Sequence, residues 1–220
     1  KKKQRIEDSR VIGTCNLVKA LEQTGEPTVL VSGSAIGYYG DQGDSELTED
    51  HPSGRDFLAG ISSAWETEAN NAITHGIRVV VIRTGIVLAH GGGALASMLL
   101  PFKMGVGGPM GSGKQWWSWI HRDDLVAICL RAISDNEMVG VYNGTAPHPM
   151  QQGDFSTVLG KVLHRPAFLP TPAFALKLAL GGFSAELLAS KRVMPKRLQE
   201  AGFEFQYPEL ETALRQALGR

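Results

Sequence analysis

The chain has 220 residues, of which 43% are hydrophobic and 20% are charged, a composition typical of a globular protein rather than a disordered one. Its 22 Lys and Arg residues balance its 22 Asp and Glu residues, so the formal net charge is zero. This balance argues against nucleic acid or an anionic membrane surface as a partner, because both select an excess of basic side chains.

The sequence lacks the signals of membrane insertion and secretion. No apolar run reaches the roughly 18 residues that a membrane-spanning helix needs, and the first ten residues hold no apolar stretch of the kind that a secretory signal requires. Cys15 and Cys129 are too few for a disulfide framework or, on their own, for a zinc site. We therefore expect a cytoplasmic protein without a metal site. Since Lys1 falls inside an expected helix, we also expect that the N-terminal part of a longer protein precedes it.

The first elements along the chain are a helix and a buried strand. Apolar residues at helical spacing predict a helix over residues 5–22, which the breakers Gly25, Glu26 and Pro27 end. The continuous apolar run 28–32 predicts a strand that is buried on both of its faces.

A long helix is then predicted over residues 57–75, with Gly76 as its C-terminal cap, and a second buried strand over 77–82. Two apolar strands joined through a helix are typical of a parallel sheet with a right-handed crossover. The rest of the chain predicts strands over residues 116–121 and 139–143, and helices over 94–102, 123–133 (with Asp123 as the N-cap), 155–163, 174–188, 194–201 and 208–218. The alternation indicates an α/β fold with a doubly wound parallel sheet and a smaller α-rich part toward the C-terminus.

Two glycine-rich segments imitate phosphate-binding loops. Gly37, Gly40 and Gly43 have the spacing of a dinucleotide fingerprint, but the polar segment after Gly43 does not predict the helix whose N–H groups would bind a pyrophosphate. The segment 108–115 is close to a P-loop, yet Gln115 stands where the magnesium-binding hydroxyl belongs. We expect neither segment to bind phosphate.

Small polar residues follow the first strand, at the edge where ligands bind in open α/β sheets. Ser32, Gly33 and Ser34 leave space for a flat ligand, and we expect the two hydroxyls to face an open crevice, where they can bond a carbonyl or carboxamide. The competing interpretation is a loop that its own serines stabilise. At the end of the second strand, Arg83 either lines the same crevice or pairs with an acidic neighbour such as Glu66 or Asp41, because a buried arginine needs a partner.

The chain resembles the extended short-chain dehydrogenase/reductase group, and within it the atypical "epimerase family" of YfcH-like proteins that are similar to nucleoside-diphosphate-sugar epimerases. The resemblance covers nearly the whole chain. Four blocks carry it: SRVIGTCNLVKAL (9–21), VLVSGSAIGYYGDQGD (29–44), GPMGSGKQWWSWIHRDDLV (108–126) and KRVMPKRLQEAGFEFQYPEL (191–210).

This resemblance implies the C-terminal part of a Rossmann-type nucleotide-binding domain over residues 1–90 and 115–147, with a small α-rich substrate-binding domain over 91–114 and 148–220. It places Ser34 at the position of the active-site serine. It also places His121 where the substrate strand meets the next helix. The strand-end residues that it sets beside the nicotinamide of NADP or NAD are Ser32, Gly33, Arg83, Thr84, Gly85 and Val87.

The sequence departs from the pattern of the group in its acid–base pair. The usual Tyr-x-x-x-Lys is absent, with Phe57 or Leu58 at the tyrosine position and Ser62 near the lysine position. An alkyl or phenyl group cannot carry a proton, so Tyr38 or Tyr39 of the serine loop is the available substitute. The glycine-rich phosphate loop that opens such proteins is also not in this chain.

A second departure concerns the substrate. Trp117 stands where related sugar-nucleotide enzymes hold a diphosphate-binding arginine, which favours an apolar or aromatic ligand for Trp117 and His121 to contact. For at least two of Trp116, Trp117 and Trp119 we expect simple packing instead. The basic residues Lys191, Arg192, Lys196 and Arg197 are expected to form a solvated helix face.

Three functions stay open at this point. The first is an NAD(P)-dependent oxidoreductase or epimerase that transfers a hydride at a carbonyl or hydroxyl carbon of a small molecule, with Ser34 on the reacting oxygen. The second, which the missing Tyr-x-x-x-Lys motivates, is an NADP(H)-binding sensor without turnover. The third is an inactive truncated product. A homodimer through the helices 5–22 and 57–75 is what the resemblance implies for assembly.

Overall fold

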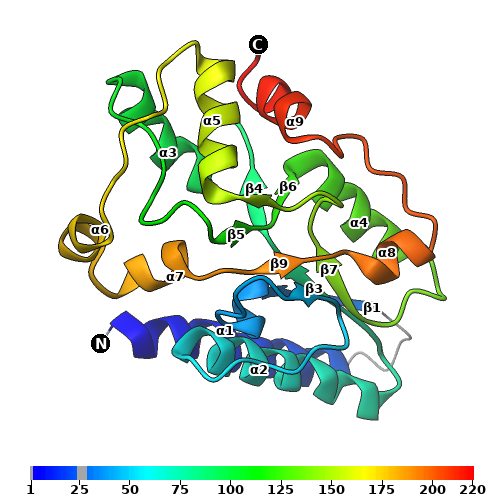
Figure 1. The fold of residues 1–220 in the computed structure, drawn as a ribbon. Coiled ribbons are helices and arrows are strands. Elements are labelled where there is room, and N and C mark those ends of the chain that lie inside the picture. Colours follow the sequence, from blue (N-terminus) through cyan, green and yellow to red (C-terminus); the bar gives the residue numbers. More distant parts are fainter. Residues whose placement is uncertain (1, 24–28) are drawn as a thin grey trace.

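The computed structural model describes residues 2–23 and 29–220 (Figure 1). Lys1 and the expected breakers Gly25, Glu26 and Pro27, together with the first residue of the expected strand, Thr28, lie outside the described residues.

A parallel three-stranded sheet is the centre of the molecule. Its order is β1–β3–β7, formed by β1 (Val29–Ala35), β3 (Arg78–Thr84) and β7 (Gly140–Gly144). Both pairs are parallel, as the apolar sequences of the first two strands predict. The register pairs Ser34 with Arg83 and Arg83 with Asn143, so three polar residues share one row near the carboxyl ends of the strands.

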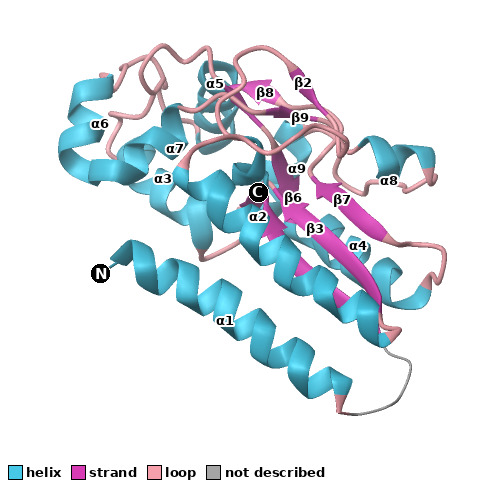
Figure 2. Cartoon of the chain, turned by 90° about the horizontal axis from the view of Figure 1, so that it is seen from below, coloured by secondary structure: helices cyan, strands magenta, loops and turns pink. Residues whose placement is uncertain are grey.

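Helices cover both faces of this sheet, because β3 presents apolar side chains alternately to each side. Val79 and Val81 pack with residues of α1 (Lys2–Glu22) and α2 (Phe57–Asn70). Val80 and Ile82 pack with residues of α4 (Arg122–Ser134) and α8 (Lys196–Glu200). Figure 2 shows α1 and α2 side by side across the same face of the sheet.

Helix α2 carries its own start and stop signals. The Asp56 carboxylate accepts a hydrogen bond from the backbone N–H of Ala59 at 2.9 Å and so caps the helix N-terminus. The expected helix 57–75 ends as a 3₁₀ helix, η2 (Asn71–His75), and Gly76 closes it in the left-handed conformation at φ 74°. The expected glycine cap is thus confirmed.

The expected strand 116–121 is two strands with different partners. β5 (Trp116–Trp117) pairs antiparallel with β8 (Met150–Gln151), whereas β6 (Trp119–His121) pairs parallel with β4 (Ile86–Leu88). Ser118 separates them: its hydroxyl donates to the carbonyl of Lys191 at 2.9 Å and accepts from the N–H of Val193 at 2.8 Å. These bonds connect it to β9 (Arg192–Val193), which pairs with β2 (Glu46–Leu47).

Two helix predictions need correction. His121, not Asp123, is the N-cap of α4, because its Nδ1 accepts from the N–H of Asp123 at 3.2 Å. The expected helix 174–188 breaks at Gly181, whose positive φ of 56° favours glycine. The remaining elements are η1 (Ile36–Tyr39), α3 (Gly93–Lys103), α5 (Gln152–Leu163), α6 (Ala173–Leu180), η3 (Gly181–Phe183), α7 (Ser184–Leu188) and α9 (Leu210–Ala217).

The C-terminal helices build a second apolar core away from the sheet. Phe155 and Leu159 of α5 pack there with Leu214 of α9, and Trp117 and Trp119 join them. Among the described residues, no helix is both long and apolar enough to cross a membrane.

Candidate functional site

The row Ser34–Arg83–Asn143 is the centre of a buried polar network. Parallel register brings the three residues together although they are far apart in sequence. The 3₁₀ helix η1 and the helix α2 complete the network with Tyr39, which ends η1, and Glu66, which lies on α2. All five side chains are buried. The carboxyl edge of the sheet therefore holds charged and hydroxyl groups away from bulk water.

Arg83 is the most connected residue of this network. Its Nε and Nη2 donate to the two carboxylate oxygens of Glu66, each at 2.8 Å. Its Nη1 donates to the Tyr39 hydroxyl at 2.9 Å and to the Glu49 carbonyl at 3.2 Å. Its Cζ lies 3.4 Å from the centre of the Tyr38 ring, a cation–π contact. Burial by itself lowers the pKa of Arg83, but the hydrogen bonds and charge of Glu66 raise it above its ordinary value, so the guanidinium stays charged.

Of the two interpretations of Arg83, the structure shows the ion pair, with Glu66 as the partner. The other acidic residue considered, Asp41, instead accepts from the backbone N–H groups of Ser190 and Gly43 at 3.1 and 3.3 Å. The pair with Glu66 is bidentate, which is the favoured geometry because a planar guanidinium fits a carboxylate with two parallel N–H···O bonds.

The serine hydroxyls do not face an open crevice. Ser34 is 5% exposed and donates to Oε1 of Glu66 at 2.6 Å. Ser32 is 6% exposed, and its hydroxyl reaches the neighbouring Gly33 carbonyl at 3.3 Å. The expectation was wrong because α2 packs against the strand and places a carboxylate beside it. Ser34 nevertheless lies next to Arg83, and Gly33 between the serines is exposed.

The two tyrosines of the serine loop differ in their surroundings. The Tyr39 hydroxyl donates to Oδ1 of Asn143 at 2.7 Å and accepts from Arg83. Burial raises the pKa of Tyr39 to about 12, although Arg83 and the hydrogen bonds act in the opposite direction. This phenol is therefore protonated at neutral pH. Tyr38 is only half-buried, and its ring packs edge-on against Tyr39 as well as over Arg83.

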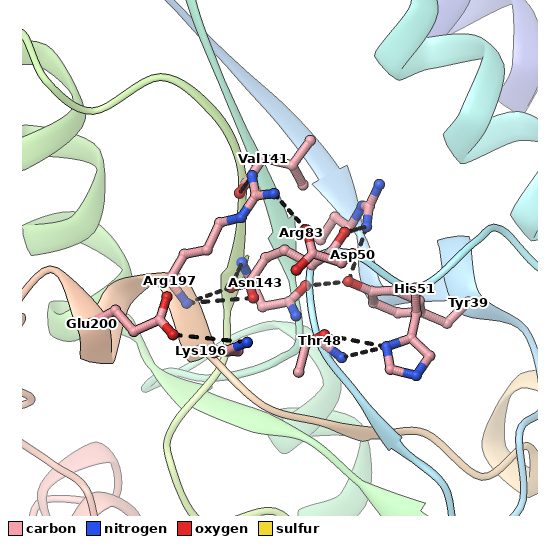
Figure 3. A network of polar contacts seen from close by, with 11 residues as sticks. Tyr39, Thr48, Asp50, His51, Arg83, Val141, Asn143, Lys196, Arg197 and Glu200 are labelled. Atoms are coloured by element: carbon pink, nitrogen blue, oxygen red, sulfur yellow. Dashed lines mark hydrogen bonds and ion pairs between the residues drawn. The ribbon is translucent and has the colours of Figure 1, made fainter.

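Glu49 extends the network to Asn143 and to Arg197 in the C-terminal part of the chain. Figure 3 shows Asn143 and Arg197 close together. Oε1 of Glu49 accepts from the backbone N–H groups of Asn143 at 3.0 Å and Arg197 at 3.3 Å. The Asn143 amide donates to the Met194 carbonyl at 2.9 Å. Arg197 donates to the Val141 carbonyl at 3.1 Å and pairs with an exposed aspartate. Sequence reasoning missed Glu49, because an acidic residue in a polar loop gives no sign that it is buried.

The other strand-end residues are less enclosed. Thr84, Gly85 and Val87 are half-buried. A Cβ at Gly85 would come 2.6 Å from the Ser118 carbonyl oxygen, so the close approach of the backbone at Ser118 explains this glycine. Ser62, which the resemblance places near the usual acid–base lysine, is buried and carries no ionisable group.

Trp117 and His121 are buried in the C-terminal core. The Trp117 Nε1 donates to the Leu187 carbonyl at 3.2 Å, and its ring packs edge-on against Phe155. Nε2 of His121 lies 2.6 Å from Oε1 of Gln216. Nε1 of Trp117 and Nε2 of His121 thus bond to C-terminal residues, and Nδ1 of His121 bonds to the start of α4, so neither side chain bonds to the Arg83 network. Their contact with a substrate stays a prediction. The packing that we expected for two tryptophans is confirmed for Trp117 and Trp119.

Of the four basic residues expected on a solvated helix face, Lys196 and Arg197 do lie on α8, and Lys196 is exposed, whereas Lys191 and Arg192 lie outside that helix. Lys191 is buried and pairs with Glu186 at 2.7 Å. Arg192 lies in a strand, over the Trp116 ring. These residues precede the helix because β9 pairs with β2, a long-range contact that helical spacing does not reveal.

The sequence of this chain is similar to known protein families and to individual proteins. The family described as "NAD dependent epimerase/dehydratase family" matches residues 1–143, and "Domain of unknown function (DUF1731)" matches residues 171–217. The chain is 45% identical over 216 residues to the Arabidopsis thaliana "Epimerase family protein SDR39U1 homolog, chloroplastic", with 97% of this chain and 62% of that protein covered. It is 39% identical to the mouse "Epimerase family protein SDR39U1", with 94% and 71% covered.

A solved structure agrees over almost every residue. The crystal structure of the human epimerase family protein SDR39U1 (isoform 2) with NADPH superimposes with a TM-score of 0.92 at 34% identity, covering 99% of this chain and 75% of that one. The chain thus spans only part of the length of these relatives. The match of the family over residues 1–143, and a relative more than two thirds covered at 39% identity, lead to one conclusion: the chain belongs to the NAD dependent epimerase/dehydratase family.

Proposed function

We propose that this chain is part of an NADP(H)-binding oxidoreductase or epimerase that transfers a hydride at a carbonyl or hydroxyl carbon of a small molecule. The observation that carries the proposal is the row Ser34–Arg83–Asn143 at the carboxyl edge of a parallel sheet, where α/β folds bind their ligands. The NADPH in the structure of the human relative favours NADP over NAD.

The residues around Ser34 suit a flat, neutral ring. Gly33 is exposed and has no side chain, and a Cβ there would come 3.2 Å from the Trp65 ring. Thr84, Gly85 and Val87 are uncharged and half-buried. A nicotinamide ring fits such surroundings, and when bound it supplies or accepts the hydride. The chain's own residues hold and orient the ring and the substrate oxygen.

Within this proposal Ser34 contacts the reacting oxygen, and Tyr38 and Tyr39 have different tasks. Tyr39, with a pKa of about 12, keeps its proton and holds Asn143 and Arg83 in place. Tyr38 is half-buried, so its phenol is the better placed of the two to meet a ligand. His121 and Trp117 belong to the substrate side of the site.

A second candidate function is an NADP(H)-binding sensor without turnover. Two observations favour it: Leu58 and Ser62 carry no group that exchanges a proton at neutral pH, and the Ser34 hydroxyl already bonds Glu66. This candidate shares cofactor binding with the first but predicts no product.

Two measurements separate these possibilities. NADPH at one hundred times its Kd is expected to stabilise the purified protein by about 2.7 kcal/mol, seen as a shift in thermal unfolding. No shift and no change of NADPH fluorescence at millimolar cofactor would refute both functions. A panel of carbonyl compounds, alcohols and sugar nucleotides then tests turnover. One substrate whose conversion is lost in Ser34→Ala selects the enzyme, whereas binding without any conversion selects the sensor.

Three further points complete the proposal. The nucleotide-binding part comprises residues 1–90 and 115–147, and the substrate-binding part comprises 91–114 and 148–220.

The protein forms a homodimer, which the exposed apolar residues Ile6, Ile12 and Leu17 of α1 support. Sedimentation equilibrium of the protein measures its oligomeric state. A cytoplasmic location is the third point, which cell fractionation tests.

A further inference from the structure

The short bond between Ser34 and Glu66 fixes where the serine proton lies. Both oxygens of the Glu66 carboxylate accept from Arg83 at 2.8 Å, and a carboxylate held this way is ionised and has no proton to donate. The 2.6 Å contact from Ser34 Oγ to Oε1 is therefore a serine O–H that donates to a carboxylate. Its length is in the range of charge-assisted O–H···O⁻ bonds.

A hydroxyl has one proton and two lone pairs. With its proton directed at Glu66, Ser34 has only acceptor capacity left for another group. The alternative, a neutral Glu66 that donates to Ser34, conflicts with the two donors that Arg83 directs at the carboxylate. Arg83 in turn is fixed by the Tyr39 hydroxyl and the Glu49 carbonyl. The direction of the serine proton is thus a consequence of the whole network.

We propose that Glu66 is a positioning residue that makes Ser34 a hydrogen-bond acceptor, so that the site selects a ligand group with an O–H or N–H donor, such as a secondary alcohol, over a carbonyl oxygen. This inference rests on the proposed function for the presence of a substrate oxygen beside Ser34. A carbonyl oxygen there would meet an acceptor, and it could bond Ser34 only if the serine gave up its bond to Glu66. Sites that bond a ligand hydroxyl strongly reject the analogue that lacks it.

The first test locates the proton directly. In neutron diffraction from deuterium-exchanged crystals of the protein, the deuteron of Ser34 is expected between Oγ and Oε1 of Glu66. A deuteron on Glu66, or one on Ser34 that points away from Glu66, overturns the proposal whatever the ligand data are.

The second test measures selection with matched probes. Cyclohexanol and cyclohexanone, and 2-pentanol and 2-pentanone, are titrated by saturation-transfer NMR against the protein with saturating NADP⁺. Each alcohol is expected to bind at least about tenfold more tightly than its ketone. Equal binding, a preference for the ketones, or no binding of the alcohols at 100 mM overturns the proposal.

Variants assign the preference to the network. Ser34→Ala is expected to abolish it, and Glu66→Gln to reduce it to about equal binding, because the amide no longer restricts the serine to donating. Glu186→Gln is the matched control: it also removes a carboxylate from a buried cation, Lys191, but leaves Ser34 untouched, so the preference should persist. If Glu66→Gln does not fold, Ser34→Ala and the neutron map still decide.

The outcomes distinguish this inference from the proposed function. Binding of NADPH, measured first by its fluorescence, is independent of the proton on Ser34. Cofactor binding without an alcohol preference refutes only the inference, whereas a protein that binds no NADPH refutes the proposed function, and the neutron map still reports on Ser34.

Discussion

The polar row at the sheet edge and the apolar core of the C-terminal helices are equally buried but are held together by opposite means. Arg83 and Glu66 are 3% and 6% exposed and are joined by hydrogen bonds, which have a preferred direction. Leu214, Phe155 and Trp119 are held by apolar packing, which has none. A buried charge must be paired with good geometry, because the cost of removing it from water is several kcal/mol. The polar row therefore fixes orientation, which a binding site needs, and the apolar core contributes chiefly to stability.

The largest effect is expected from breaking the ion pair on one side only. Glu66→Ala leaves Arg83 buried without its carboxylate, so we expect the free energy of unfolding to fall by about 3–5 kcal/mol. Urea denaturation measures this. Glu200→Gln, which removes an exposed partner of Lys196, serves as the control and should have a much smaller effect. Equal losses in the two variants would contradict the comparison.

In the apolar core, the free energy of unfolding should depend on the volume of the buried side chains rather than on charge. Leu214→Ala removes a fully buried side chain of α9 and leaves a cavity, so a loss of about 2–5 kcal/mol is expected by the same denaturation experiment. Leu178→Ala on α6 is a suitable control, because that leucine is largely exposed. Cofactor-site residues are untouched, hence NADPH binding at low temperature should be unchanged in both variants.

Alkaline pH offers a way to weaken the polar row without mutation. Burial raises the pKa of Tyr39 from 10.0 to about 12, so between these values the unfolded chain releases a proton that the folded protein keeps. The stability that depends on this proton is complete below pH 10 and is lost as the pH rises to 12, by about 2–3 kcal/mol in all. Urea denaturation at a series of pH values measures the loss, and Tyr39→Phe should remove this part of it.

The smallest of these effects is expected from the Tyr39 hydroxyl itself at neutral pH. Tyr39→Phe leaves Oδ1 of Asn143 and Nη1 of Arg83 short of one partner, which should cost about 1–3 kcal/mol. Tyr38→Phe keeps the ring over Arg83 and should cost less. A larger loss in Tyr38→Phe than in Tyr39→Phe would show that the tyrosines are assigned the wrong way round.

The parts of the fold that sequence reasoning could predict are those with local signals. The apolar runs of β1 and β3, the helix that begins at Phe57 and the cap at Gly76 all depend on neighbouring residues. Ser118 and Lys191 were interpreted wrongly, one as the middle of a strand and the other as part of a solvated face. Both depend on the placement of β9, which bonds to Ser118 and pairs with β2 between residues 146 positions apart. Short-range patterns hold no information on such contacts.

For the site, the sequence by itself determined the inventory: Ser34 and Arg83 at the ends of two apolar strands, Glu66 as a possible partner, and the absence of the usual Tyr-x-x-x-Lys pair. Only the tertiary structure decided how these residues are used. Parallel register set Ser34 beside Arg83, and the packing of α2 brought Glu66 to both, which buried the hydroxyl that was expected to face a crevice. The reason is that the direction of a hydrogen bond depends on which partners packing brings within 3 Å, and residue type does not specify that.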